Sequence, residues 1–121
     1  MHPTDYKDLE IKNHKCFFVG GVKNKIDDKE ITKGTMYIEQ FTPKIHKKNQ
    51  KIIFIHGGGQ TGAGFLGTPD GRRGWVHDFL LAGFEVFVAD QPGRGRSGYS
   101  NKLYGDYIDR ELDVDDCERR F

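Results

Sequence analysis

An α/β fold with a parallel strand pair is predicted by residues 51–90. A run of β-branched and aromatic residues at 51–56 has the composition of a buried strand. Apolar residues at helical spacing follow at 75–82, where the helix stops before Gly83, and a second apolar run follows at 84–90. Strand, helix and strand in this order form a βαβ unit, which requires a parallel pair joined by a right-handed crossover.

Two strands are predicted before this unit. The first occupies residues 9–19 and ends at the glycine pair 20–21. The second occupies residues 36–41 and is closed by Pro43, because proline cannot continue a strand ladder.

The connections between these elements differ in composition. The charged segment 23–33 is predicted to be a solvated loop, and the lysine-rich segment 44–51 an exposed hairpin tip. A basic binding patch is the alternative for 44–51, although no aromatic residues are interleaved there. Glycine-rich loops are expected at 57–74 and 91–98.

With 121 residues the chain is one domain at most. Within a single domain, 1–121, we expect a frayed polar terminus at 1–8 and the strands and first helix at 9–98. The charged tail at 99–121 is expected to form a surface helix or to be disordered in isolation.

Charge and cysteine content narrow the partners and the location. The 19 basic and 18 acidic side chains leave a net charge of +1, which offers no field for nucleic acid or a membrane surface. No apolar run approaches a membrane span, and the start of the chain lacks the apolar core of a signal peptide. Cys16 and Cys117 fit neither a CxxC pair nor zinc-ligand spacing, so we expect free thiols and a cytoplasmic location. A disulfide between the two stays open.

Four glycines between residues 57 and 62 follow the strand at 51–56 directly. Glycines allow positive φ and leave backbone N–H groups uncovered by side chains. At the carboxyl end of a parallel strand, such N–H groups are suited to binding an anion or a developing oxyanion.

A nucleotide site is one interpretation of these glycines. Gly57, Gly59 and Gly62 satisfy GxGxxG, and Asp90 ends the next strand. That site needs a helix that starts in the loop, whereas further glycines and a proline delay any helix until Trp75. A P-loop is excluded because no Lys-Ser or Lys-Thr pair closes the segment.

An oxyanion hole is the interpretation that the sequence favours. An ester hydrolase must stabilise the negative oxygen of a tetrahedral intermediate, and fixed backbone N–H groups do so without reorganising. A plain tight turn is the structural alternative, but the glycines and the long excursion after them exceed what a turn needs.

Three motifs in a fixed order carry a resemblance: HGGGQTG at 56–62, TPDGRRGW at 68–75 and DQPGRGRS at 90–97. Together they resemble the N-terminal part of an α/β-hydrolase, in particular a bacterial and fungal carboxylesterase-like branch. The resemblance covers residues 14–121 and implies the N-terminal part of an α/β-hydrolase sheet. It also implies hydrolysis of a carboxylic ester by acyl transfer to serine, with a small-molecule ester as substrate and with no metal or organic cofactor.

The resemblance assigns roles to five residues of the glycine loop. Gly58 and Gly59 would provide the oxyanion-hole N–H groups. His56, Gly57 and Gln60 would support the same loop. The segments 68–75 and 90–97 would be mainly structural, the latter as an Asp–Arg lock.

The catalytic residues of the family are missing from the chain. Its chemistry needs a serine on a G-x-S-x-G elbow, then an acid, then a histidine. The nearest match, 95–99, has Tyr99 in place of the last glycine and follows the wrong strand. His56 is expected to bond to backbone at a strand end, and His77 to lie on a helix surface. The sequence therefore predicts an N-terminal fragment of a serine carboxylic-ester hydrolase that is inactive alone.

Two alternatives remain open. One is a non-catalytic ligand-binding or interaction module of the same fold, and the more distant one is a nucleotide-binding βαβ unit. In the resembled family the strand at 51–56 has a further neighbour that this chain lacks. The strand from Ile52 to Ile55 would then be an open apolar edge, and such edges recruit other chains. We therefore expect the isolated chain to be marginally stable or to self-associate.

Overall fold

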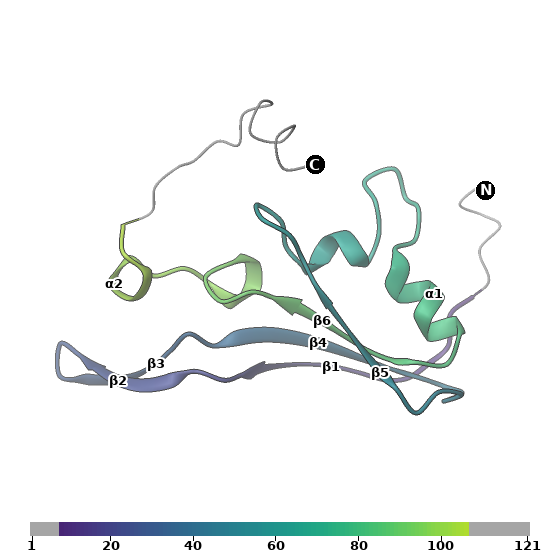
Figure 1. Cartoon of the computed structure of the whole chain (residues 1–121), viewed down its shortest axis with the longest axis horizontal. Coiled ribbons are helices and arrows are strands. Elements are labelled where there is room, and N and C mark those ends of the chain that lie inside the picture. Colours follow the sequence, from purple (N-terminus) through teal and green to yellow (C-terminus); the bar gives the residue numbers. More distant parts are fainter. Residues whose placement is uncertain (1–7, 107–121) are drawn as a thin grey trace.

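The computed structural model describes residues 8–106. Within that range the elements follow in the order β1 (Ile11–Val19), β2 (Val22–Ile26), β3 (Lys29–Lys33), β4 (Met36–Pro43), β5 (Lys51–Ile55), the 3₁₀ helix η2 (Gly62–Phe65), α1 (Trp75–Leu81), β6 (Glu85–Asp90), the 3₁₀ helix η3 (Gly95–Ser97) and α2 (Asn101–Tyr104). Figure 1 shows a long sheet with the helices gathered on one side of it.

Four of the strands form one mixed sheet in the order β1-β4-β6-β5. β1 and β6 each pair antiparallel with β4, and β5 pairs parallel with β6. The predicted α/β fold, with two N-terminal strands and a strand–loop–helix–strand unit, is confirmed. Because β6 lies between β4 and β5, the segment 44–51 is not a hairpin tip as predicted; it carries the chain across the end of the sheet.

The charged segment 23–33 is a β-hairpin and not a loop, so this prediction was wrong. β2 and β3 pair in register from Val22–Lys33 to Ile26–Lys29, and Figure 1 shows them as an arm beyond β1 and β4. Asp27 and Asp28, at the turn, have φ of 50° and 60°. Two consecutive residues with positive φ are the signature of a type I′ turn, whose twist matches that of paired strands. The turn chemistry thus overrides the high charge of the segment.

The hydrophobic core lies between the sheet and α1. Its buried members come from β5, β6 and α1: Phe54, Val76, Leu80, Val86 and Val88. Phe79 of α1 also meets the Phe54 ring edge-on, at 5.3 Å between centroids. The apolar spacing that predicted a helix at 75–82 therefore marks the face that packs on the sheet.

His77 is not the helix-surface residue that the sequence predicted. Its exposed fraction is 7%, and its ring contacts the guanidinium of Arg73 one turn earlier. Its backbone N–H donates to the Gly74 carbonyl oxygen at 3.2 Å. The helical spacing alone does not show these contacts with the residues that precede the helix.

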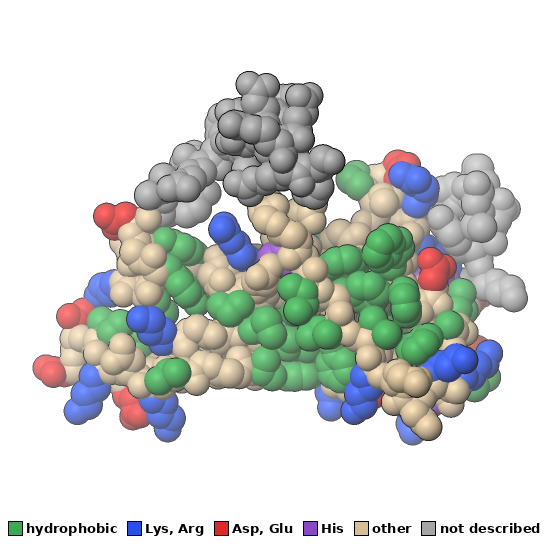
Figure 2. Space-filling model, viewed as in Figure 1, with side chains coloured by type: hydrophobic (Ala, Val, Ile, Leu, Met, Phe, Trp, Pro, Cys, Tyr) green, Lys and Arg blue, Asp and Glu red, His purple; other side chains and the backbone are tan. Residues whose placement is uncertain are grey.

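β5 lies at the edge of the described sheet, with only β6 as a neighbour. Ile52 and Phe54 pack on the core side, so Ile53 and Ile55 point to the opposite face, where they are 51% and 54% exposed. In Figure 2 hydrophobic side chains gather over the part of the view where β4, β5 and β6 lie. The strand therefore presents both an open edge and an apolar face.

Most of the predicted terminal segments, 1–7 and 107–121, lie outside the described residues. The short helix α2 is the part of the charged tail that the structure describes. Over residues 8–106, we find no helix with both the length and the apolar character needed to cross a membrane.

Candidate oxyanion site

His56 holds the start of the glycine loop. Its exposed fraction is only 4%, and both ring nitrogens bond to backbone. Nδ1 lies 2.9 Å from the carbonyl oxygen of Gly57, and Nε2 accepts the N–H of Gln91 at 3.0 Å. These partners assign the ring proton to Nδ1. The Gln91 side chain in turn donates to the His56 carbonyl oxygen at 2.7 Å, so the ends of β5 and β6 are joined twice.

Residues 57–60 form a β-turn in which two N–H groups stay uncovered. The Gln60 N–H donates to the Gly57 carbonyl oxygen at 3.3 Å, and Gly59 has φ of 74°. A positive φ at the third position is typical of a type II turn, which leaves the N–H groups of its two central residues unused. Within residues 8–106, the N–H groups of Gly58 and Gly59 donate to no protein acceptor. A Cβ on Gly58 would meet nothing within 4 Å, so the space beside this turn is open.

Asp90 holds the far end of the same loop. Its Oδ1 accepts the N–H of Gly62 at 2.8 Å. A Cβ on Gly62 would lie 2.5 Å from Cγ1 of Val88, so only glycine allows this approach. Gly95 is placed in the same way against Asp90 from the second loop, with φ of 44°.

Asp90 also binds Arg96 and is fully buried. Its Oδ2 accepts the backbone N–H of Arg96 at 2.8 Å and the Nε–H at 2.9 Å. Burial opposes ionisation, but the hydrogen bonds from Arg96 and from the Gly62 N–H outweigh it and lower the pKa of Asp90 to about 2. The guanidinium continues to Glu39 at 2.9 Å, and the bonds to both carboxylates raise the pKa of Arg96. Asp90 is therefore a carboxylate that fixes both glycine loops against β6.

The segment 95–99, the nearest match to a G-x-S-x-G elbow, contains Ser97, whose hydroxyl is occupied. Ser97 donates from Oγ to the Asp90 carbonyl oxygen and accepts the N–H of Tyr37 at 2.9 Å. Both bonds tie η3 to the ends of β4 and β6. This serine is part of the scaffold.

The segment 68–75 forms a wall beside the loop. The Arg72 N–H donates to Oγ1 of Thr68 at 3.0 Å, and the Arg72 Nε lies 3.0 Å from Oδ2 of Asp70. The hydrogen bond from Thr68 and then the contact with Arg72 lower the pKa of Asp70. A Cβ on Gly74 would lie 2.0 Å from the Phe65 carbonyl oxygen, so the wall returns tightly against η2 before α1 begins.

Between the turn and η2 lies an open hollow of about 490 Å³. It is lined by Gly59, Gln60, Thr61, Gly64 and Phe65. Ligand pockets commonly have volumes of roughly 300–1,000 Å³, and this hollow opens beside the uncovered N–H groups. Of the five residues that the sequence assigned to the loop, Gly59 and Gln60 line this hollow, and His56, Gly57 and Gly58 directly precede them in the chain.

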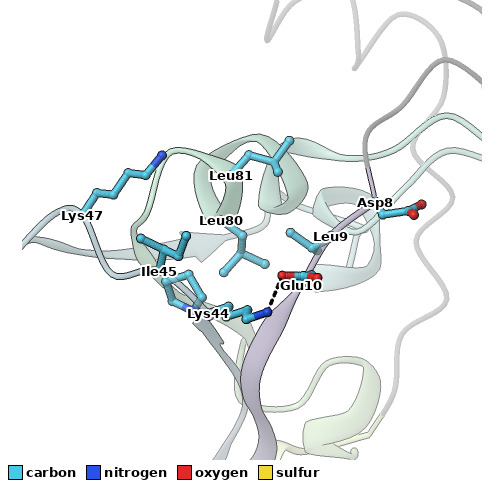
Figure 3. Close-up of a pocket in the computed structure, with 9 residues that line it drawn as sticks. Asp8, Leu9, Glu10, Lys44, Ile45, Lys47, Leu80 and Leu81 are labelled. Carbon is cyan, nitrogen blue, oxygen red and sulfur yellow. Dashed lines mark ion pairs between the residues drawn. The ribbon is translucent and has the colours of Figure 1, made fainter.

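Figure 3 shows a different groove, at the opposite end of the sheet. Leu9, Ile45, Leu80 and Leu81 give it an apolar lining, and Glu10 and Lys44 form an ion pair of 2.8 Å across it. Its volume is about 210 Å³, and none of the glycine-loop residues reaches it. This groove is therefore separate from the glycine loop.

The sequence missed one part of this arrangement. It predicted an Asp–Arg lock in the segment 90–97 but gave no role to Gln91. The position of Gln91 directly after Asp90 could have indicated this role, because the parallel strands β5 and β6 end at the same edge of the sheet. The loop also differs from a nucleotide site. A nucleotide site needs a helix N-terminus within the loop to bind the phosphates, whereas α1 begins only at Trp75, after the segment 68–74.

Comparison with known proteins relates the chain to two hydrolases. No protein-family model matches the chain. A curated relative named "Probable secreted lipase phiG", from Fungal sp. (strain ATCC 74256), is 38% identical over 97 residues, which are 80% of this chain. The solved structure of a bacterial esterase is 32% identical, with a TM-score of 0.71 over 86% of this chain. The chain therefore has a hydrolase fold of the esterase kind.

The chain spans 24% of the curated relative's length and 37% of the solved esterase chain. It corresponds to a part of each hydrolase, as the missing catalytic residues predicted. The predicted cytoplasmic location is contradicted, because the relative is named a secreted lipase. Two cysteines carry too little information to identify a redox compartment.

Proposed function

We propose that this chain supplies the oxyanion hole of a serine carboxylic-ester hydrolase. The observation that carries the proposal is the turn at 57–60, which leaves the N–H groups of Gly58 and Gly59 uncovered beside an open hollow. The names of the two matched proteins, a lipase and an esterase, support an ester as substrate. The secreted relative favours an extracellular location for this protein too.

Stabilisation of the tetrahedral intermediate is the chemical task of this turn. As a nucleophile attacks the ester carbonyl carbon, the carbonyl oxygen becomes negative and accepts hydrogen bonds from the two N–H groups. Loss of one such donor typically raises the barrier by roughly 3–4 kcal/mol. The donors are effective because their positions are fixed beforehand, here by His56 at one end of the loop and by Asp90 at the other.

The nucleophile, the acid and the catalytic histidine of this reaction are not in the 121 residues. Ser97 is bonded to backbone on both sides, and His56 is turned into its own loop. We therefore propose that residues 1–121 alone hydrolyse no ester. The open edge of β5 is where the remaining sheet of a complete hydrolase would pair.

That same edge supports a second candidate, an interaction module without catalysis. The exposed side chains of Ile53 and Ile55 give β5 the properties of a strand that pairs with other chains. In the isolated chain this edge would pair with a second copy. The two candidates differ in whether ester hydrolysis appears when the natural polypeptide is complete.

The test compares residues 1–121 with the longest natural polypeptide that contains them. Each is assayed for hydrolysis of p-nitrophenyl acetate and p-nitrophenyl butyrate, before and after treatment with a serine-directed organophosphate. We expect turnover that the organophosphate abolishes in the longer polypeptide and none in residues 1–121. A folded longer polypeptide without esterase activity would favour the interaction module. Serine-dependent turnover by residues 1–121 would refute the proposal that the nucleophile lies outside these residues.

A further inference from the structure

Three side chains with metal-binding atoms meet on the core side of β1 and β4. His14 and Cys16 are two residues apart on β1, so they point to the same face of the sheet. Cys16 lies directly opposite Glu39 of β4. The His14 nitrogen, the Cys16 sulfur and a Glu39 carboxylate oxygen all lie within 4.8 Å of one another.

We propose that His14, Cys16 and Glu39 bind a zinc ion. Imidazole nitrogen, thiolate sulfur and carboxylate oxygen are the ligands that zinc takes in proteins, at roughly 2.0–2.3 Å. Ligand atoms at these distances in a tetrahedron lie roughly 3–4 Å apart. The present spacing is compatible with that geometry after small side-chain rotations, because Nε2 of His14 and Oε2 of Glu39, now 2.7 Å apart, would separate around the ion. Water would take the fourth position.

The charges around the three ligands suit a divalent cation. Arg96 contacts Glu39, but the fully buried Asp90 neutralises its guanidinium. Glu39 therefore contributes one negative charge, and Cys16 contributes a second when its thiol releases a proton to solvent on binding. The group and a Zn²⁺ ion are then neutral together, and no unbalanced charge remains at this half-buried place.

The neighbouring side chains hold the ligands in position. The His14 ring stacks on Phe41, with 4.5 Å between centroids, and Arg96 fixes the Glu39 oxygen that faces away from His14. The Tyr37 hydroxyl also hydrogen-bonds with Cys16, the kind of outer contact that orients metal ligands.

Solvent can reach the site, since the His14 side chain is 43% exposed while Glu39 is 10% exposed. The site lies on the β1 side of the sheet, whereas the oxyanion turn follows β5 at the opposite edge. The zinc proposal therefore stands independently of the proposed hydrolase function. This site was not predicted from the sequence, because one ligand comes from a strand more than twenty residues away and the His-x-Cys pair alone is too sparse a motif.

The test is zinc binding by the purified, reduced protein, measured by competition with a chromophoric chelator and by cobalt substitution. We expect one zinc per chain with a dissociation constant at or below the micromolar range. Cobalt should give a thiolate charge-transfer band and the visible bands of tetrahedral coordination. His14→Ala and Cys16→Ala should each weaken zinc binding at least tenfold, and Cys16→Ala should abolish the charge-transfer band.

Two matched variants control for other donors in the chain. Cys117→Ser removes the other thiol, and His46→Ala removes an exposed histidine of the loop 44–50. Both should bind zinc as tightly as the unaltered protein, and circular dichroism should show the same fold for all four variants. A folded protein that binds no zinc, or that binds it equally well without Cys16, would overturn the proposal.

Discussion

Replacing Asp90 by asparagine tests the lock that holds both glycine loops. The carboxylate accepts hydrogen bonds from the Gly62 N–H and from three N–H groups of Arg96. Asparagine keeps one oxygen but places an amide donor against the donors of Arg96. The variant therefore loses the charge and also introduces unsatisfied donors at a fully buried position.

The cost follows from the pKa of Asp90. It is about 2 in the folded protein, compared with about 3.9 for an unfolded aspartate, and one pKa unit corresponds to about 1.36 kcal/mol. The ionised carboxylate thus contributes roughly 2–3 kcal/mol to the free energy of unfolding at neutral pH. We expect Asp90→Asn to lose about this amount. The loss of stability should be smaller than for a fully buried ion pair, because the Arg96 side chain is 37% exposed and retains its ion pair with Glu39 in the variant.

Urea unfolding followed by the fluorescence of Trp75, the single tryptophan, measures this loss. With a denaturant slope of about 1–3 kcal/mol per molar for small proteins, the midpoint should fall by roughly 1–3 M. Because the folded-state pKa is lowered, the contribution is complete above about pH 5 and is lost as the pH falls through about 2. The difference between wild type and variant should shrink over this interval. Equal midpoints at pH 7, or a difference that persists at pH 1.5, would refute the assigned role of Asp90.

Two further predictions concern packing and the sheet edge. Gly62→Ala should lower the free energy of unfolding by about 1–3 kcal/mol in urea titrations, because the new Cβ would lie 2.5 Å from Val88. Gly64→Ala is the matched control and should change the free energy of unfolding little, because a Cβ there meets nothing within 4 Å. A loss at both glycines alike would argue against this packing. In light scattering after gel filtration, Ile53→Lys should reduce self-association of residues 1–121 by charging the open β5, whereas Ile45→Lys, at an exposed loop position, should not. A strictly monomeric wild-type chain would remove the basis for the edge contact.

The sequence predicted the elements whose signals are local. The apolar run at 51–56, the helical spacing at 75–82 and the run at 84–90 each specify their own conformation, and all three were found. The hairpin of β2 and β3 was missed because it depends on the positive φ of Asp27 and Asp28, which cannot be predicted from the composition of the segment. The high charge of that segment is compatible with a two-stranded arm that buries little.

Long-range pairing accounts for the other differences. No local pattern shows that β6 inserts between β4 and β5, so the segment 44–51 was interpreted as a hairpin tip. His77 contacts Arg73, which precedes the helix, and the helical spacing does not show that contact. For the site, the glycines identify the turn, whereas the lock at its ends depends on Gln91 and Asp90 of the neighbouring strand. The sequence therefore indicates the turn but not the contacts that fix its ends.

The central claim, that the Gly58 N–H binds a developing oxyanion, can be tested at a single atom. Gly58 occupies the second position of its turn, where proline is favoured, and a side chain there meets open space. Gly58→Pro removes the N–H and keeps the turn, whereas Gly58→Ala adds a Cβ and keeps the N–H. The measurement is kcat for p-nitrophenyl ester hydrolysis by the complete natural polypeptide carrying each variant. We predict a roughly 100- to 1,000-fold loss for Gly58→Pro and less than a tenfold loss for Gly58→Ala. Equal activity of the two variants would contradict the account.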